Sequence, residues 1–305
     1  MTGSRTRSSS SRCPRGWRIP EVRPDVAVVL LGLTSAIAWG AGDFGGGLMS
    51  RRVPLFGVVL TTQLFGMVVA LVIAIARGEP APAGADLGWS VAAGLCGVVG
   101  MTSLYRGLAV GRMGVVAPVT GVLGAVVPVL VGFVTEGVPA AATVAGIGVA
   151  LLAVVLVTRA PGHQTSRPSG VEWALLAGAG IGGFNICVGQ LSGAGQFGPL
   201  VVLRLVQSVV LVTLIVVWRQ PWRMHRLDVA KLSVVGVLDM TGNVAFITAA
   251  QVGALAVATI LSSLYPVTTV LLALTLLHER VTKSHLLGIA LTVVAIVLIT
   301  VGTTG

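Results

Sequence analysis

The hydrophobic residues of this chain gather in ten long runs that short polar connections separate. Each run is close to the ~20 residues that a helix needs to cross a ~30 Å hydrocarbon core. The runs are apolar on all sides and too long for barrel strands, which alternate in polarity over about ten residues. Helix is then the structure that satisfies the backbone in lipid. The expected spans are 26–48, 54–76, 87–110, 114–135, 139–158, 171–191, 198–218, 229–250, 254–277 and 284–302.

Composition agrees with a membrane protein. Of the 305 residues, 55% are hydrophobic and 10% are charged, whereas a soluble domain carries about 25% charged residues. The net charge of +10 would suggest nucleic acid in a soluble protein. In a membrane protein we expect no nucleic acid, and anionic lipid headgroups as the partner. The fold class predicted is an all-α integral membrane protein with about ten transmembrane helices.

The N-terminal residues 1–25 hold six arginines and many serines. A secretory signal peptide has a similar charge pattern. The following apolar run, however, continues to Leu48, past any plausible cleavage site. We therefore expect a disordered basic tail. Cys13, Cys96 and Cys187 have no metal-type spacing, and the two in apolar runs, Cys96 and Cys187, are expected to be packing residues.

The chain divides at a polar linker over residues 159–170, with five spans on each side. Glu136 and Glu279 each close a fourth span, and GIGVALLAVVLVT (146–158) parallels GIALTVVAIVLIT (288–300). These matches predict two repeats, over 26–158 and 171–302. Because five is odd, two such copies face opposite ways across the membrane. This inverted topology suits alternating access to a central site.

Three stretches carry a resemblance to a known family: WGAGDFGG (39–46), VVPVLVGFVTEGVPAAATVAGI (126–147) and LSSLYPVTTVLLALTLLHERVTKSHLLGIAL (261–291). With them the chain resembles a ten-helix member of the drug/metabolite transporter superfamily with two EamA-type repeats. The resemblance implies a permease that moves small metabolites, often outward. It also implies a substrate site between the two halves.

Four charged residues lie well inside the spans: Asp43, Arg106, Arg204 and Asp239. A charge at mid-bilayer costs at least ~2.5–3.5 kcal/mol, so such residues usually pair or line a wet cavity. Arg204 and Asp239 lie on successive spans and are expected to pair, either at a substrate site or as a structural pair. Asn243 is one helical turn from Asp239, on the same face.

Aromatic residues accompany these charges. Trp39 is one turn before Asp43, and Tyr265 precedes Pro266 in the middle of the ninth span, where a proline kink would border a cavity. Arg106 lies near its span's end and can alternatively extend to the interface. Asn185 and Gln190 are weaker candidates, because amides also join helices. The candidate substrate-binding residues are Trp39, Asp43, Arg106, Arg204, Asp239, Asn243 and Tyr265.

Two glycine patterns, at 40–45 and 178–183, fit G-x-G-x-x-G. They lie inside spans rather than after a soluble strand, so helix packing is expected instead of a dinucleotide site. The sequence contains no phosphate-binding G-x-x-x-x-G-K-[ST] loop and no H-E-x-x-H motif. We therefore expect no cofactor and no bound metal. If transport is coupled to an ion, Asp43 or Asp239 would carry a proton.

The sequence thus predicts a secondary-active or facilitative transporter of small metabolites or drugs, and not an enzyme. An integral-membrane enzyme and a non-transporting scaffold are the alternatives. The ten spans predict a multi-pass protein of the cell membrane, and two lysines against eighteen arginines hint at a GC-rich bacterial genome and so at a bacterial inner membrane. If the spans alternate, most basic residues share one side and would place both termini outside. The six arginines of the tail favour the opposite orientation, so the sequence does not decide between the two.

Overall fold

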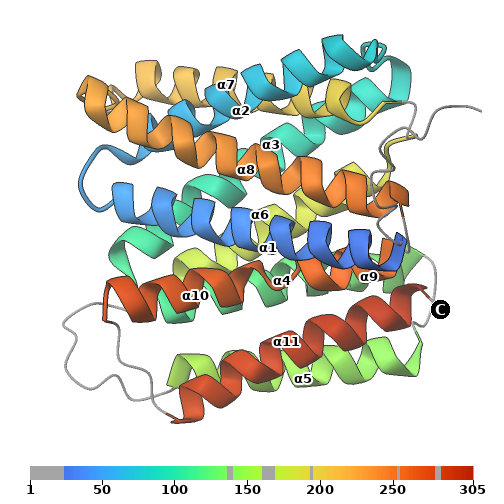
Figure 1. The fold of residues 1–305 in the computed structure, drawn as a ribbon. Helices are drawn as coiled ribbons and strands as arrows, with labels where there is room; N and C mark the ends of the chain where they lie inside the picture. Colours follow the sequence, from blue (N-terminus) through green and yellow to red (C-terminus); the bar gives the residue numbers. More distant parts are fainter. Residues whose placement is uncertain are drawn as a thin grey trace, which may run out of the picture.

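A computed structural model describes residues 24–135, 140–159, 169–192, 195–252, 255–278 and 283–304. These residues form eleven helices and contain no strand (Figure 1). Residues 1–23, Glu136, Glu279 and most of the linker lie outside the described part of the chain. The helices are α1 (Pro24–Met49), α2 (Leu55–Arg77), α3 (Gly84–Val110), α4 (Met113–Thr135), α5 (Ala141–Arg159), α6 (Val171–Gly189), α7 (Phe197–Val217), α8 (Arg226–Val252), α9 (Leu255–Ser262), α10 (Tyr265–Leu276) and α11 (Lys283–Thr304).

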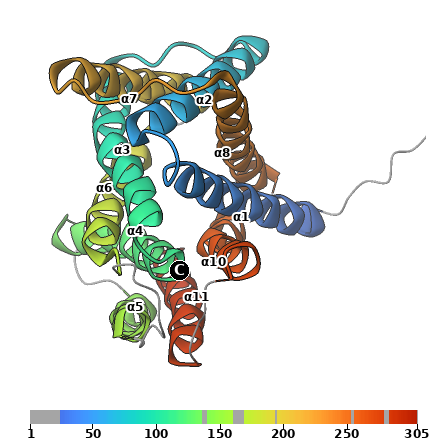
Figure 2. The same cartoon turned by 90° about the vertical axis from the view of Figure 1, so that its left-hand side faces the viewer.

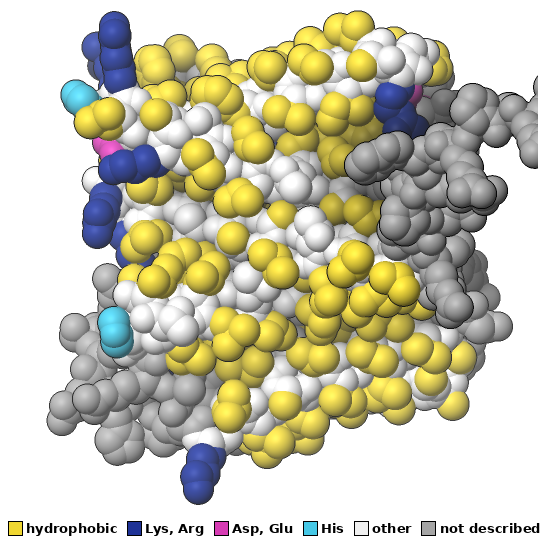
Figure 3. All heavy atoms as spheres, viewed as in Figure 1, with side chains coloured by type: hydrophobic (Ala, Val, Ile, Leu, Met, Phe, Trp, Pro, Cys, Tyr) yellow, Lys and Arg dark blue, Asp and Glu magenta, His cyan; other side chains and the backbone are white. Residues whose placement is uncertain are grey.

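The predicted all-α membrane fold is confirmed. Within the described residues eight segments are long and apolar enough to cross a membrane, and two shorter apolar segments, Ala141–Leu156 and Leu286–Gly302, complete ten. Valine, leucine and isoleucine side chains cover the outside of the bundle (Figure 3). Ile75, for example, is 72% exposed. Such a surface would aggregate in water and is suited to lipid.

The ninth span differs from the kinked helix that the sequence suggests, because it is broken into α9 and α10. The first ends at Ser262, and the second begins at Tyr265 with Pro266 in its first turn. Proline has no N–H to donate and its ring clashes with the preceding turn. At the start of a helix both problems vanish, because the first N–H groups have no intrahelical partner. The chain therefore stops one helix and starts another here.

The two membrane faces carry different charges. We call the face where α1 begins and α11 ends the termini face, and the opposite one the arginine face. Lysine and arginine gather at the arginine face, on the left of Figure 3. Among the described residues the termini face carries Arg77, Glu79 and Asp86 near its helix ends. The arginine face holds Arg51, Arg52, Arg112, Arg219, Arg223, Arg226 and Lys231.

The helix contacts show an approximate two-fold relation between α1–α5 and α6–α11. The first helix of each half packs against the third helix of the other, as α1 on α8 and α6 on α3. Helices of the same rank also meet, α2 with α7 and α5 with α11. Figure 2 looks roughly along the helices and shows these pairs side by side. Because each half has five spans, the halves cross the membrane in opposite directions.

Glycine allows the closest of these contacts. A Cβ added at Gly180 of α6 would lie 2.5 Å from the backbone nitrogen of Gly100 in α3. In the first-half pattern, a Cβ added at Gly40 of α1 would lie 2.5 Å from the backbone oxygen of Tyr265 in α10. Both glycine patterns singled out in the sequence therefore serve close helix packing.

The largest buried cluster lies toward the arginine face. It includes Phe44, Tyr105, Leu108, Val116 and Leu232, all near the arginine-face ends of their helices. The Arg51 guanidinium also donates hydrogen bonds of 3.0 and 3.2 Å to the carbonyl of Leu108, which ties α1 to α3. The protein is densely packed on this face.

Candidate functional site

A cavity of about 870 Å³ lies between the two halves. Gly132 of α4 and Thr300 and Gly302 of α11 line it near the termini face. Asp43 of α1 and Leu104 of α3 line its deep end, in the half of each helix nearer the arginine face. The cavity therefore extends inward from the termini face and stops above the cluster that fills the arginine face. Its volume suits a small organic molecule.

A contact between α4 and α10 closes the deep end. A Cβ added at Gly121 of α4 would lie 2.8 Å from Cγ and 3.8 Å from Cβ of Pro266 in α10. The same position would lie 3.5 Å from the Tyr265 hydroxyl oxygen. Any larger side chain at Gly121 would push these helices apart. We call this contact the floor; it joins one helix from each half.

An ion pair with a bound amide forms one side of the cavity. Arg204 of α7 bonds to Asp239 of α8 through Nη2, and its Nη1 donates a 2.7 Å hydrogen bond to the Gln63 side-chain oxygen in α2. The Arg204 side chain is 6% exposed and that of Asp239 is 24% exposed, toward the cavity. The ion pair that the sequence predicts is therefore present.

The sequence places these two residues on successive spans, but the structure brings them together across a third helix, α2. α7 and α8 both pack against α2, and the side chain of Arg204 reaches past Gly66 of α2 to its partner. A Cβ at Gly66 would lie 2.5 Å from Nη1 of Arg204. The absence of a side chain at Gly66 therefore makes room for the guanidinium.

The backbone carbonyl of Asp239 joins α1 to α8. It accepts a 3.2 Å hydrogen bond from the Trp39 indole N–H and a 2.8 Å bond from the Asn243 amide. Gly242 lies flat against the indole, since a Cβ there would be 2.6 Å from the indole nitrogen. The ring of Trp39 is therefore held in one orientation on the cavity wall.

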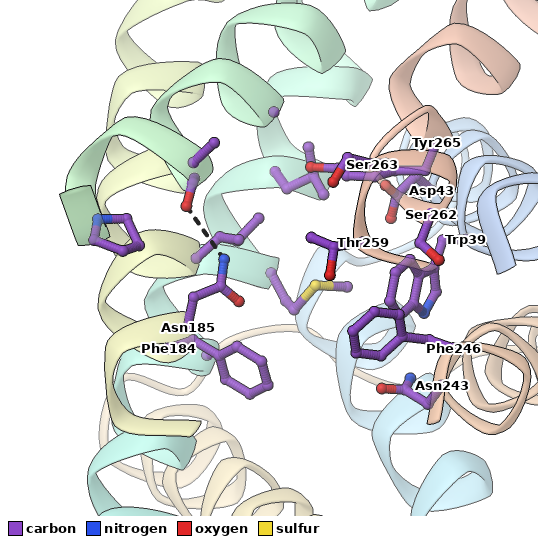
Figure 4. A pocket seen from close by; sticks show the side chains of 18 of the residues that line it. Trp39, Asp43, Phe184, Asn185, Asn243, Phe246, Thr259, Ser262, Ser263 and Tyr265 are labelled. Atoms are coloured by element: carbon purple, nitrogen blue, oxygen red, sulfur yellow. Dashed lines mark hydrogen bonds between the residues drawn. The ribbon is translucent and has the colours of Figure 1, made fainter. Parts of the chain in front are cut away.

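Asp43 stands beside three aromatic rings. The ring centroids of Trp39 and Phe246 are 5.9 Å apart, and those of Trp39 and Tyr265 are 6.4 Å apart in an edge-on arrangement. Asp43 is close enough to Tyr265 to interact with it electrostatically. Figure 4 shows all four on one wall, with Phe184 on the opposite wall. We call Trp39, Phe246 and Tyr265 the aromatic wall.

Asp43 itself has no hydrogen-bond or ion-pair partner among the described residues. The charged group that acts on it is Asp239, which repels it. An unpaired carboxylate deep in a membrane is costly. The group must therefore hold a proton, contact water in the cavity, or meet a cation.

The acidic residues that line the cavity are few in the described part of the chain. Asp43 and Asp239 are the two carboxylates of that part of the chain that line it. Within the described ranges, no group of three His, Cys, Asp or Glu residues could hold a metal ion. What the arrangement can do is bind a small molecule through one carboxylate, several hydroxyls and amides, and aromatic surfaces.

The model of the EamA-like transporter family matches residues 26–159 and again residues 168–301. The chain belongs to this family. It is therefore a multi-pass membrane transporter of the permease type, built of two EamA repeats, and this family consists of transporters and not of enzymes.

Comparison with solved structures agrees on the fold. Twenty-three solved chains match. One, described only as the crystal structure of a protein, has a TM-score of 0.59 and is 17% identical; the match covers 90% of this chain and 98% of that one. At that identity the likeness concerns the fold alone. None of the curated proteins matches the chain.

In this EamA-like transporter six of the seven predicted site residues line the cavity: Trp39, Asp43, Arg204, Asp239, Asn243 and Tyr265. Arg106 does not. It is exposed near the arginine face, with its guanidinium 5.9 Å above the ring of Trp173. The neighbouring Tyr105 and Leu108 face the core instead, so the turn of α3 directs Arg106 outward, as the interface alternative supposes.

Of the two weaker candidates, Asn185 and Gln190, only the first lines the cavity. Asn185 of α6 lines the cavity and donates a 3.2 Å hydrogen bond to the carbonyl of Gly124 in α4. Gln190 lies just after α6 and is exposed. Asn185 thus both joins two helices and faces the cavity, opposite Asp43 (Figure 4).

Sequence reasoning missed several lining residues. Gln63 is a lone amide deep in the apolar run of α2, and that isolation was a usable signal. Ser262 is 2% exposed, and its hydroxyl has no partner among the described residues. Phe184 and Phe246 gave no signal, because phenylalanine is ordinary in a membrane span.

Proposed function

We propose that this EamA-like transporter is a secondary-active or facilitative permease for small metabolites or drugs. The cavity would be its substrate site, and alternating access its mechanism. One observation carries the proposal. The cavity lies between two inverted repeats, reaches the termini face, and is closed toward the arginine face by a crossing of α4 and α10.

The two repeats differ at the helices that form this crossing. In the first half α4 is one helix with Pro118 and Pro128 inside it. In the second half the corresponding span is divided into α9 and α10. An exchange of these two shapes would move α4 away from α10 at the arginine face and bring α4 toward α9 at the termini face. Such an exchange opens the other side of the same cavity.

The residues divide into two groups under this mechanism. Asp43, Asn243, Tyr265 and Trp39 would contact substrate from the wall, while the Arg204–Asp239 pair would hold α7 and α8 around α2. If transport is coupled to protons, Asp43 is the better carrier, because Asp239 is already neutralised by Arg204. The Asp43→Asn variant would then lose its response to a pH gradient, and transport by Asp239→Asn would keep it.

We place the protein in a plasma membrane, which the arginine-rich composition suggests is a bacterial inner membrane. The arginine face would contact anionic headgroups, at about 1 kcal/mol for each basic residue near the lipid surface.

A reversible lock on the floor tests the proposal. The distance of 3.8 Å between a Cβ placed at Gly121 and Cβ of Pro266 suits a disulfide. The pair Gly121→Cys and Pro266→Cys would be built in a variant whose native cysteines are serine. Proteoliposomes would be screened for uptake of a metabolite library by mass spectrometry.

We expect transport in the reduced protein, loss after oxidation, and recovery after reduction. The matched control is the single variant Pro266→Cys, whose transport should not respond to oxidation. Uptake that continues unchanged with the floor cross-linked would rule out alternating access through this cavity.

A further inference from the structure

The charges that line the cavity do not cancel. The ionisable acidic and basic side chains among its described lining residues are Asp43, Arg204 and Asp239. Arg204 and Asp239 neutralise each other. With Asp43 ionised, the cavity carries one net negative charge, and that charge has no partner in the described part of the protein. Such an uncompensated charge inside a membrane span is costly, and a positively charged ligand would remove it.

The cavity has little to offer an anion. Arg204 is its single cation among the described residues, and both terminal nitrogens of that guanidinium are already bonded, to Asp239 and to Gln63. The remaining nitrogen, Nε, is buried without a partner among these residues and is not in contact with the open space. An anionic substrate would also meet the unpaired charge of Asp43. Electrostatics therefore excludes anions more strongly than it does neutral molecules.

The surroundings of Asp43 suit a particular kind of cation. The aromatic wall of Trp39, Phe246 and Tyr265 lies beside the carboxylate. The face of an aromatic ring attracts cations, most strongly for tryptophan and in a desolvated site. Phe184 and Met101 add apolar surface across the cavity. A small hydrated ion would leave these surfaces unused.

We propose that the substrate is an organic cation, an amine or quaternary ammonium group on an aromatic or apolar body. The charged group would bind between the Asp43 carboxylate and the aromatic wall, and the body would extend toward Phe184. This inference rests on the proposed function, because it names the substrate class of the same cavity.

Tetraphenylphosphonium is a suitable probe, because its charge is permanent and its body is aromatic. Binding to the purified full chain would be measured by equilibrium dialysis in detergent, with neutral triphenylphosphine oxide as the comparison. We expect the cation to bind at least about tenfold more tightly than the neutral compound. Loss of a buried charge partner costs binding more than a rim contact does. Asp43→Asn should therefore lower the affinity for the cation about thirtyfold or more.

Further variants separate binding from folding. Asp43→Glu keeps the charge and should bind within a few-fold of the natural protein, whereas Phe246→Leu removes one ring and should lose about fivefold. Asp228→Asn, a carboxylate on the arginine face outside the cavity, is the matched control and should bind normally. Thermal melting of each variant shows that the fold is intact.

The outcomes distinguish this inference from the proposed function. Equal binding of cation and neutral analogue, or equal affinity in a folded Asp43→Asn variant, overturns the cation inference. Suppose that the protein transports neutral or anionic solutes, that Asp43→Asn does not change this transport, and that cross-linking the floor stops it. The permease mechanism then stands and the cation inference fails. If the cation binds as expected but cross-linking the floor leaves all transport unchanged, the site is real and the mechanism is wrong.

Discussion

The Arg204–Asp239 pair should respond asymmetrically to the loss of its two members. Arg204→Met leaves a carboxylate whose side chain is 24% exposed toward the cavity, where water or a proton can relieve it. Asp239→Leu leaves a guanidinium that is 6% exposed, with Gln63 as its remaining hydrogen-bond partner among the described side chains. We therefore expect Asp239→Leu to destabilise the protein more than Arg204→Met does.

The magnitudes follow from the burial. Removing one member of a buried ion pair typically costs ~3–5 kcal/mol, because the other charge is left uncompensated. Asp239→Leu should fall at the upper end and Arg204→Met at or below the lower end. Arg204→Met combined with Asp239→Leu removes both charges, and such neutral replacements are often harmless or stabilising. We expect the double variant to recover at least the stability of Arg204→Met.

The free energy of unfolding of the purified full chain in mixed micelles, titrated with denaturant, measures these differences. Arg106→Met is the matched control, because Arg106 is exposed and its guanidinium lies over the ring of Trp173; it should cost below about 1 kcal/mol. The double variant leaves Asp43 untouched, so its affinity for tetraphenylphosphonium should stay within a few-fold of normal. Greater destabilisation by Arg204→Met than by Asp239→Leu, or no recovery in the double variant, would refute this reasoning.

Three further predictions concern single contacts. Gly66→Ala places a methyl group 2.5 Å from Nη1 of Arg204, so its free energy of unfolding should fall by about 1–3 kcal/mol; unchanged stability would contradict the packing. Cys96 of α3 and Cys187 of α6 pack in the same buried cluster, so copper–phenanthroline should join them, with two fewer maleimide-reactive thiols by mass spectrometry; persistence of both thiols would count against the α3–α6 pairing. The Glu79 carboxylate accepts bonds of 2.9, 2.7 and 3.2 Å from the N–H groups at the start of α7. Glu79→Ala should therefore lower the unfolding free energy by about 1 kcal/mol, and Glu79→Gln by less, with equal effects arguing against a charge contribution.

The fold could be predicted from the sequence because lipid leaves few choices. A span of about twenty apolar residues has helix as its main solution, and the matching runs at 146–158 and 288–300 reveal the repeat. The break between α9 and α10 could not be located in advance. Pro266 predicts an irregularity in the helix. Whether the helix kinks or ends there depends on whether neighbouring helices satisfy the backbone groups that the proline leaves unbonded. Here α10 begins at Tyr265, and Gly121 of α4 leaves room for the ring of Pro266 in its first turn.

The site was predictable as far as its charges, because a buried charge is rare and needs a partner. That reasoning pairs Arg204 with Asp239 from the sequence alone. It does not place Gln63 or Phe246, since amides and phenylalanines occur in spans for many reasons. It also includes Arg106, because sequence depth alone does not tell which side of a helix faces lipid. The rotation of α3, set by the packing of Tyr105 and Leu108, decides that point.

The central claim is that the two faces of the cavity open in turn, through opposite movements around α4. Electron paramagnetic resonance can measure it with one spin-label pair on each face. Leu130 of α4 and Val257 of α9 are exposed to lipid at the termini face. Arg112, just before α4, and Leu276, at the end of α10, mark the arginine face.

We expect each spin-label pair in proteoliposomes to show a short and a long distance, with the short distance at one face accompanying the long distance at the other. When the termini-face distance shortens, the arginine-face distance lengthens. Gly121→Val, which wedges the floor, should shift both pairs toward the state open at the arginine face. Distances that stay single and unchanged at both faces, or that lengthen together, would contradict the account.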